Sequence, residues 1–178
     1  MKTSLFKSSL VIIAACLTPQ AVADVIDSSA SGFTLTFKRE LAAEPMQAYK
    51  ALTDGIGNWW LAAHTWYGDS SNMRLTATLN GCLCEVSDQG ETEHLRVVKV
   101  EPGKLIRLTG GLGPLQAEGL HGVMDWRLAT TDDGRTSVIT VYYRVGGYSP
   151  NDLSKWAPAV DNVLQQQMDS LQSYLLDL

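Results

Sequence analysis

The sequence is short of positive charge, of histidine and of long apolar runs, and each shortage argues against a class of protein. Its 178 residues include 14 Lys and Arg against 19 Asp and Glu, with three His. Because an acidic surface repels phosphate backbones, we expect no nucleic-acid partner. The apolar run 10–17 is far shorter than the roughly 20 residues of a membrane-spanning helix, and no second run of that length follows. No repeat, low-complexity stretch or linker divides the rest, which favours one domain.

The first 23 residues have the order of a secretory signal peptide: two lysines, the apolar run, and a small-residue exit at 21–23. We therefore expect cleavage after Ala23 and a mature domain, 24–178, that is periplasmic or secreted. Losing two lysines leaves 12 basic and 19 acidic residues, a net charge of −7. One alternative stays open, because residues 13–16 resemble a lipobox. Lipidation of Cys16 would anchor the domain to a membrane.

Local patterns predict the first elements of the mature chain. Residues 33–38 alternate apolar and polar side chains, which indicates a strand with one buried face. Pro45 suits the first turn of a helix, and the spacing of 46–52 is helical. We expect Gly55 and Gly57 to end that helical region.

Three turns predict antiparallel hairpins: Asn80-Gly81, Pro102-Gly103-Lys104 and Asp133-Gly134. Each turn sets a register in which apolar residues share one face. The expected cross-strand pairs are Leu79 with Cys82, Ala77 with Cys84, Leu75 with Val86, Val100 with Ile106, Val98 with Leu108, Leu128 with Ile139, Trp126 with Val141, and Met124 with Tyr143. The second register also places His94 and Arg96 on the inner face.

From Ser154 onward the spacing becomes that of a helix, with an apolar stripe from Trp156 to Leu178 and a polar opposite face. The order of elements predicts an α+β domain. It has a first strand, two short helices, a curved antiparallel sheet of about six to seven strands in all, and a long C-terminal helix.

Local features add a family resemblance: the helix 44–52 followed by Trp59 and Trp60, the segment 98–108, and Trp126. With the order of elements, they resemble the helix-grip fold of the START-like, or SRPBCC, superfamily over about residues 31–178. That superfamily includes birch pollen allergen-like proteins, polyketide cyclases and aromatases, and activators of the heat-shock ATPase.

Three further stretches, 64–69, 81–85 and 110–115, are similar to those of an exported branch of that superfamily. The resemblance implies an apolar cavity between the sheet and the C-terminal helix, suited to lipids, sterols, polyketides or aromatic molecules. It does not imply catalysis, because the superfamily contains binders, transporters and a few enzymes.

Aromatic and polar side chains near the expected cavity are the candidate ligand-binding residues. Indole and phenol rings stack on planar molecules, and a few polar groups orient them. The candidates are Trp59, Trp60, His64, Trp66, Cys84, Arg96, His121, Trp126 and Tyr143. For the aromatic members the alternative is ordinary core, above all for Trp126 and for Trp156 of the last helix.

Cys82 and Cys84 are the thiols that remain after cleavage. In an extended strand their α-carbons would lie about 6.6–6.8 Å apart, at the edge of what a disulfide spans. We expect two small buried side chains, with a redox pair or a metal site as alternatives. A metal site would gather these thiols with Asp69 and the three histidines, whose scattered spacing does not favour one ion. We therefore expect no metal and no cofactor.

The expected function is non-covalent binding of a small hydrophobic or aromatic molecule, or a lipid, by an exported protein. No nucleophile motif of a hydrolase is present, and no catalytic residue is assigned. The alternative is a cyclase- or aromatase-type enzyme that uses His94, Arg96 or His121 for proton transfer. A second alternative is a protein-interaction module.

Overall fold

The computed structural model describes residues 24–132 and 134–178, so the expected signal peptide and Asp133 lie outside the described residues. The strands are β1 (Asp24–Ser29), β2 (Gly32–Leu41), β3 (Met73–Leu75), β4 (Cys82–Ser87), β5 (Gly90–Glu101), β6 (Leu105–Gly110), β7 (His121–Thr130) and β8 (Ser137–Gly146). The helices are α1 (Pro45–Thr53), α2 (Ile56–Trp59) and α3 (Ala157–Leu176). No helix among the described residues is both long and apolar enough to cross a membrane.

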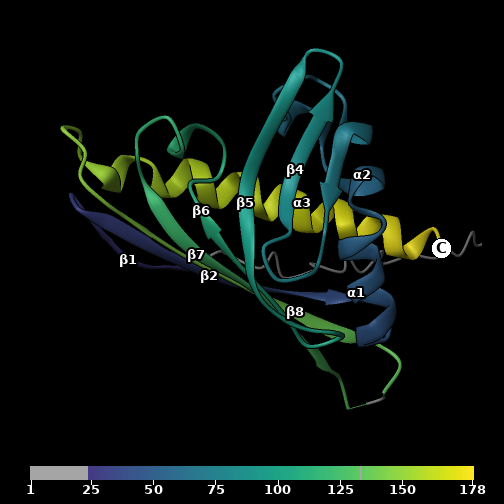
Figure 1. The fold of residues 1–178 in the computed structure, drawn as a ribbon. Coiled ribbons are helices and arrows are strands. Elements are labelled where there is room, and N and C mark those ends of the chain that lie inside the picture. Colours follow the sequence, from purple (N-terminus) through teal and green to yellow (C-terminus); the bar gives the residue numbers. More distant parts are fainter. Residues whose placement is uncertain (1–23, 133) are drawn as a thin grey trace, which may run out of the picture.

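One antiparallel sheet has the strand order β1-β2-β8-β7-β6-β5-β4-β3. Figure 1 shows this sheet curving around α3, which lies across it, with α1 and α2 near the C-terminal half of α3. The predicted α+β helix-grip architecture is confirmed. The sheet has eight strands rather than six or seven, because β1 has no apolar alternation by which to recognise it. It forms as an exposed edge strand that pairs with β2.

The hairpin of β7 and β8 has the predicted register. Leu128 lies opposite Ile139, Trp126 opposite Val141 and Met124 opposite Tyr143. All six side chains are buried. This agreement follows from two strands that both alternate strictly, so that only one register buries every apolar side chain.

The strands on either side of Asn80-Gly81 do pair antiparallel, but the predicted register of this hairpin is wrong. β3 pairs Leu75 with Leu83, and residues 76–81 form a longer connection. Leu83 is therefore on the inner face and fully buried, together with Glu85. The cysteines lie on the other face of β4. This pairing buries Leu83 in place of the two thiols, while Leu79 and Val86, which the predicted register placed on the inner face, are exposed.

Two bulges, one at Val98 and one at His94, change which side chains of β5 face inward. Val100 lies opposite Ile106 as expected, but a register shift at Val98 places Val97 opposite Leu108. Beyond the shift the alternation is reversed. Arg96 is consequently exposed on the outer face, which corrects its predicted position.

Helix α3 is amphipathic as predicted, and its stripe packs on the sheet. The buried members of the stripe are Leu164, Met168, Leu171 and Leu175. Leu178 lies beyond the helix and is exposed. Arg39 of β2 binds the polar face of α3. Its Nε lies 2.6 Å from Asp169 Oδ1, and its Nη2 donates to Gln165 Oε1 at 2.8 Å.

The first helix, α1, ends at Thr53, just before Gly55, as predicted. Gly57 lies inside α2, the second short helix, which continues to Trp59. The Trp59 indole N–H then donates to the Ala51 carbonyl oxygen at 2.8 Å, which ties α2 back to α1.

Candidate functional site

An apolar pocket of about 320 Å³ opens between the N-terminal half of α3, the loop after α2, and the loop after β6. His94 of β5 is part of its lining. The lining residues are Trp60, Ala63, His64, Thr65, Trp66, His94, Leu112, Gly113, Pro114, Leu115, Trp156, Ala159, Val160 and Val163. A pocket with apolar walls and few polar groups is the usual form of a small-molecule site.

Three of the predicted ligand-binding residues, Trp60, His64 and Trp66, line this pocket. His94, which the sequence offered for the enzyme and metal alternatives, lines it as well, and so does Trp156. The lining also includes residues 112–115, which belong to the stretch 110–115 that carried part of the family resemblance. The structure thus brings aromatic side chains from three separate segments to one opening.

Three other predicted residues belong to the packed interior. Trp59 and Trp126 are almost fully buried with their rings 6.3 Å apart. Tyr143 is also buried, and its hydroxyl accepts from the Leu112 amide and donates to the Gly110 carbonyl oxygen, each at 3.2 Å. Burial raises the pKa of Tyr143 to about 12, so the phenol stays protonated. These aromatic residues support the pocket from behind and do not line it.

The remaining three predicted residues lie away from the pocket lining. Arg96 forms a surface ion pair with Glu93. His121 is exposed, and its Nε2 lies 2.6 Å from Thr109 Oγ1. Cys84 is bonded to Cys82. The bulge at Val98 turns Arg96 outward, and the pairing of Leu83 with Leu75 turns Cys84 outward. His121 lies at the start of β7.

Helix α3 positions the loop that forms one pocket wall. The Leu61 amide donates to Oε1 of the buried Gln167 at 2.9 Å, and Ser170 Oγ donates to the Trp59 carbonyl oxygen at 2.6 Å. Within the loop, the Trp60 indole N–H donates to the His64 carbonyl oxygen at 3.2 Å. The wall is therefore held by hydrogen bonds to a helix that packs on the sheet.

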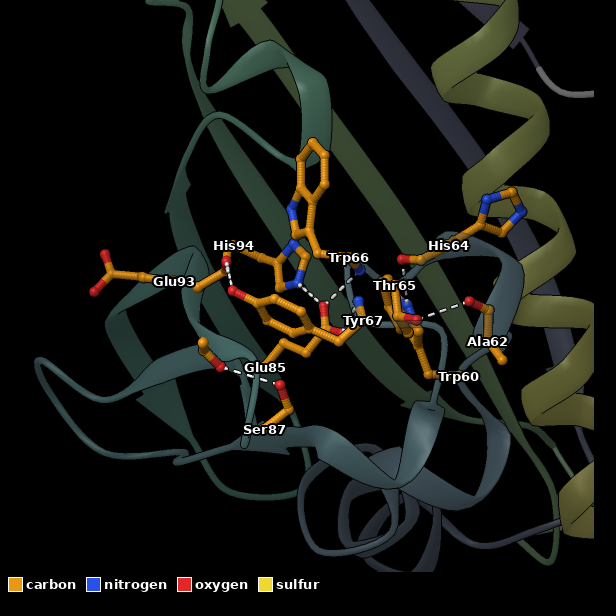
Figure 2. Close-up of polar contacts among 12 residues, drawn as sticks. Trp60, Ala62, His64, Thr65, Trp66, Tyr67, Glu85, Ser87, Glu93 and His94 are labelled. Atoms are coloured by element: carbon orange, nitrogen blue, oxygen red, sulfur yellow. Dashed lines mark hydrogen bonds and ion pairs between the residues drawn. The ribbon is translucent and has the colours of Figure 1, made fainter.

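Glu85 is the charged residue most deeply buried beside the pocket, with 0% of its surface exposed. Its two carboxylate oxygens accept hydrogen bonds from the backbone amides of Trp66 and Tyr67, both at 2.8 Å. Figure 2 shows the carboxylate between this loop and the His94 ring. A buried carboxylate needs such donors to replace its hydration, so Glu85 fixes the loop that carries Trp66.

His94 completes the arrangement, with Nε2 lying 3.2 Å from Glu85 Oε2 (Figure 2). Because a carboxylate accepts, Nε2 carries the hydrogen, and Nδ1 of the neutral ring is an acceptor. Burial lowers the pKa of His94, and the nearby Glu85 offsets this only in part. The ring is therefore neutral at pH 7, and its buried Nδ1 has no hydrogen-bond partner among residues 24–132 and 134–178.

The sequence pattern missed Glu85, because the predicted pairs turn its neighbours Cys84 and Val86 inward and so place Glu85 on the outer face. The available signal was Leu83, the one large apolar side chain that the predicted register left outside. Choosing the register that buries Leu83 also turns Glu85 inward, since residues two apart share a face.

A disulfide joins Cys82 and Cys84, contrary to the expectation of two buried thiols. Their α-carbons are 5.3 Å apart, shorter than the roughly 6.6–6.8 Å of an extended strand. The register with β5 shifts at this point, from Leu83 opposite Leu95 to Cys84 opposite Glu93. His94 is the extra residue in the bulge and points inward beside Leu95. The disulfide and the inward position of His94 thus occur at one irregularity of the sheet.

Reducing this disulfide is expected to lower the free energy of unfolding by about 1.5 kcal/mol, because the closed loop of three residues removes little entropy from the unfolded chain. Thermal unfolding with and without reductant, beside a Cys82→Ser/Cys84→Ser variant, measures the change. The double variant should match the reduced protein and ignore reductant. An unfolding curve of the unaltered protein that ignores reductant would contradict the disulfide.

Metal-ligand side chains gather at one place within 24–132 and 134–178: Cys82, Cys84 and Glu93 have ligand atoms within 4.8 Å of one another. While the disulfide is intact the sulfurs are not thiolates, and thiolate is the form that binds metals. The histidines of the hypothesised metal site are not part of this group.

Comparisons with known proteins identify the fold of this chain through solved structures. No protein-family model matches the chain, and no curated protein matches it. Solved structures do match, among them protein MLL2253 from Mesorhizobium loti, with 20% identity, a TM-score of 0.56, and coverage of 81% of this chain and 96% of that one.

Two further similar structures are CalU16 and Ara h 8.0201. CalU16 from Micromonospora echinospora has 10% identity and a TM-score of 0.55, over 88% of this chain and 85% of that one. Ara h 8.0201 has 15% identity and a TM-score of 0.56, over 82% and 99%. At such identities the likeness concerns the backbone alone. Together with the eight-stranded sheet and the helix across it, these matches show that the chain has the helix-grip fold.

Proposed function

We propose that this protein is an exported member of the START-like superfamily that binds a small apolar or aromatic molecule. The observation that carries the proposal is the pocket of about 320 Å³ with its three tryptophans, Trp60, Trp66 and Trp156. A cavity of this size and composition suits a ligand with one or a few rings. Catalysis is not required for any feature of this lining.

The position of the pocket refines the expected site. The space behind Trp126 and Tyr143 is packed core, so the proposed ligand lies nearer β5 and the N-terminal half of α3. Trp66 is 51% exposed and lies on the loop held by Glu85. An exposed indole at the mouth of an apolar pocket is area that a ligand can cover.

Export is part of this proposal. The signal-peptide pattern of residues 1–23 is its basis, and the disulfide between Cys82 and Cys84 supports it. Disulfides persist in oxidising compartments and are rare in the cytosol.

Native mass spectrometry of the protein, isolated from the cells that make it, tests both parts. We expect a polypeptide mass that begins at Asp24, and a non-covalent adduct that organic extraction releases as a small molecule. A mass with a lipid on Cys16 would change the proposed location to a membrane anchor. Protein that carries no small molecule in repeated preparations, and takes up none from an extract of the same cells, would contradict binding.

A second candidate function is proton-transfer catalysis of the cyclase type. Of the three residues that the sequence offered for it, His94 lies in the pocket lining, and its contact with Glu85 is the observation in favour. Arg96 and His121 are not in that lining. The candidate therefore depends on His94 and Glu85 alone.

A further inference from the structure

The polar groups of the pocket differ in how far they are already satisfied. The Trp60 indole donates to the His64 carbonyl oxygen, the Thr65 hydroxyl donates to the Ala62 carbonyl oxygen at 2.8 Å, and His64 Nε2 lies 3.2 Å from Gln166 Oε1. Nδ1 of His94 has no such partner among the residues that the structure describes. Among the buried side-chain atoms without a partner in the described part of the chain, it alone belongs to the pocket lining.

An unpartnered buried acceptor costs free energy, so beside a cavity it is a point at which a hydrogen-bond donor of a ligand would be favoured. Glu85 decides which kind of group that is. By accepting from Nε2–H it leaves only the lone pair of Nδ1 for a ligand. The pocket therefore complements a hydrogen-bond donor and rejects an acceptor at this point.

We infer that His94 and Glu85 form a proton-accepting subsite, and that it selects molecules with a hydroxyl group on an aromatic ring. The inference rests on the proposed function and names its ligand class. The aromatic ring of such a ligand can stack on the pocket walls made by Trp60, Trp66 and Trp156. Its phenolic hydroxyl is a stronger hydrogen-bond donor than the hydroxyl of an alcohol. The negative charge of Glu85 strengthens the bond by polarising the imidazole toward the imidazolium.

Access to Nδ1 requires a small movement, because this atom is buried beneath the lining. Trp66 is the exposed one of the three tryptophans in the wall, and exposed side chains change rotamer on a picosecond to nanosecond timescale. We place the hydroxyl at Nδ1 and the ring against the indole of Trp66 after that side chain has turned.

The test uses two probes of nearly equal shape, 2-naphthol and 2-methoxynaphthalene, of which only the first can donate a hydrogen bond. Titration of the mature protein should give 2-naphthol an affinity about three- to tenfold higher. Excited 2-naphthol is a strong acid that emits at longer wavelength after losing its proton to a nearby base. With protein in excess, we expect that long-wavelength emission from the bound probe.

A variant adds a control. His94→Phe keeps an aromatic ring and removes the acceptor, so it should bind both probes equally and leave bound 2-naphthol with the emission of the neutral form. The comparison of the two probes on the unaltered protein decides the matter even where this variant does not fold. Equal affinity for both probes, with neutral emission, would overturn the inference and leave the proposed function standing. Failure of both probes to bind would count against the proposed function itself.

Discussion

Replacing Glu85 with alanine is expected to lower the free energy of unfolding by about 3–5 kcal/mol, the largest stability change predicted for this protein. The variant removes a fully buried carboxylate and leaves the amides of Trp66 and Tyr67 without their acceptor. It also leaves both ring nitrogens of His94 without a partner. Each buried polar group left unpaired adds its own desolvation cost.

Thermal or denaturant unfolding measures the effect, and for a domain of this size a loss of 3 kcal/mol lowers Tm by about 6–12 °C. Glu93→Ala is the matched control, since this neighbouring glutamate is on the outer face, is partly exposed and pairs with Arg96. A surface ion pair contributes about 1 kcal/mol or less. Similar losses for the two variants would contradict the structural role assigned to Glu85.

Replacing Val163 with tryptophan is expected to lower the affinity for a pocket ligand at least about tenfold, because the loss of ring contacts alone exceeds 1.4 kcal/mol. Val163 is half-buried, and its side chain faces the cavity from α3. The larger indole has room to enter the pocket, so we expect the free energy of unfolding to change by less than the 1–3 kcal/mol typical of an overpacked core.

Asn162→Trp makes the same change one residue earlier, on the exposed side of α3 and outside the lining. It should bind 2-naphthol, or any compound extracted from the natural protein, as the unaltered protein does. Affinity is measured by fluorescence or calorimetric titration on both variants, after their unfolding curves have been compared. If Val163→Trp retains full affinity, the ligand occupies another part of the molecule.

Much of the framework followed from local patterns. The strict alternation in 121–130 and 137–146 allowed one register, and the helical spacing after Ser154 identified the buried stripe of α3. In both cases the position of a residue within its own strand or helix decides whether its side chain is on the buried face. The aromatic character of the loop at 59–66 likewise indicated a pocket wall, and Trp60, His64 and Trp66 lie there.

Where the pattern was ambiguous, the prediction was wrong in a consistent way. Asn80-Gly81 is a strong turn signal, yet Leu83 belongs inside and the longer connection at 76–81 follows from that. Arg96 and His94 are two residues apart and were predicted to share the inner face. The bulge at Val98 turns Arg96 outward, and the second bulge returns His94 to the interior. A bulge depends on how two strands meet, and neither strand encodes it alone.

The sequence by itself determined the α+β class, the amphipathic helix that closes the chain, and the aromatic residues near an opening, because these depend on spacing within one segment. Only the tertiary structure decided that Glu85 and His94 meet. Their contact requires β3 to pair through Leu83, β5 to bulge beside the disulfide, and the loop at Trp66 and Tyr67 to donate its amides. Burial of a carboxylate is favourable only when all these partners arrive together, so no single segment could reveal the site.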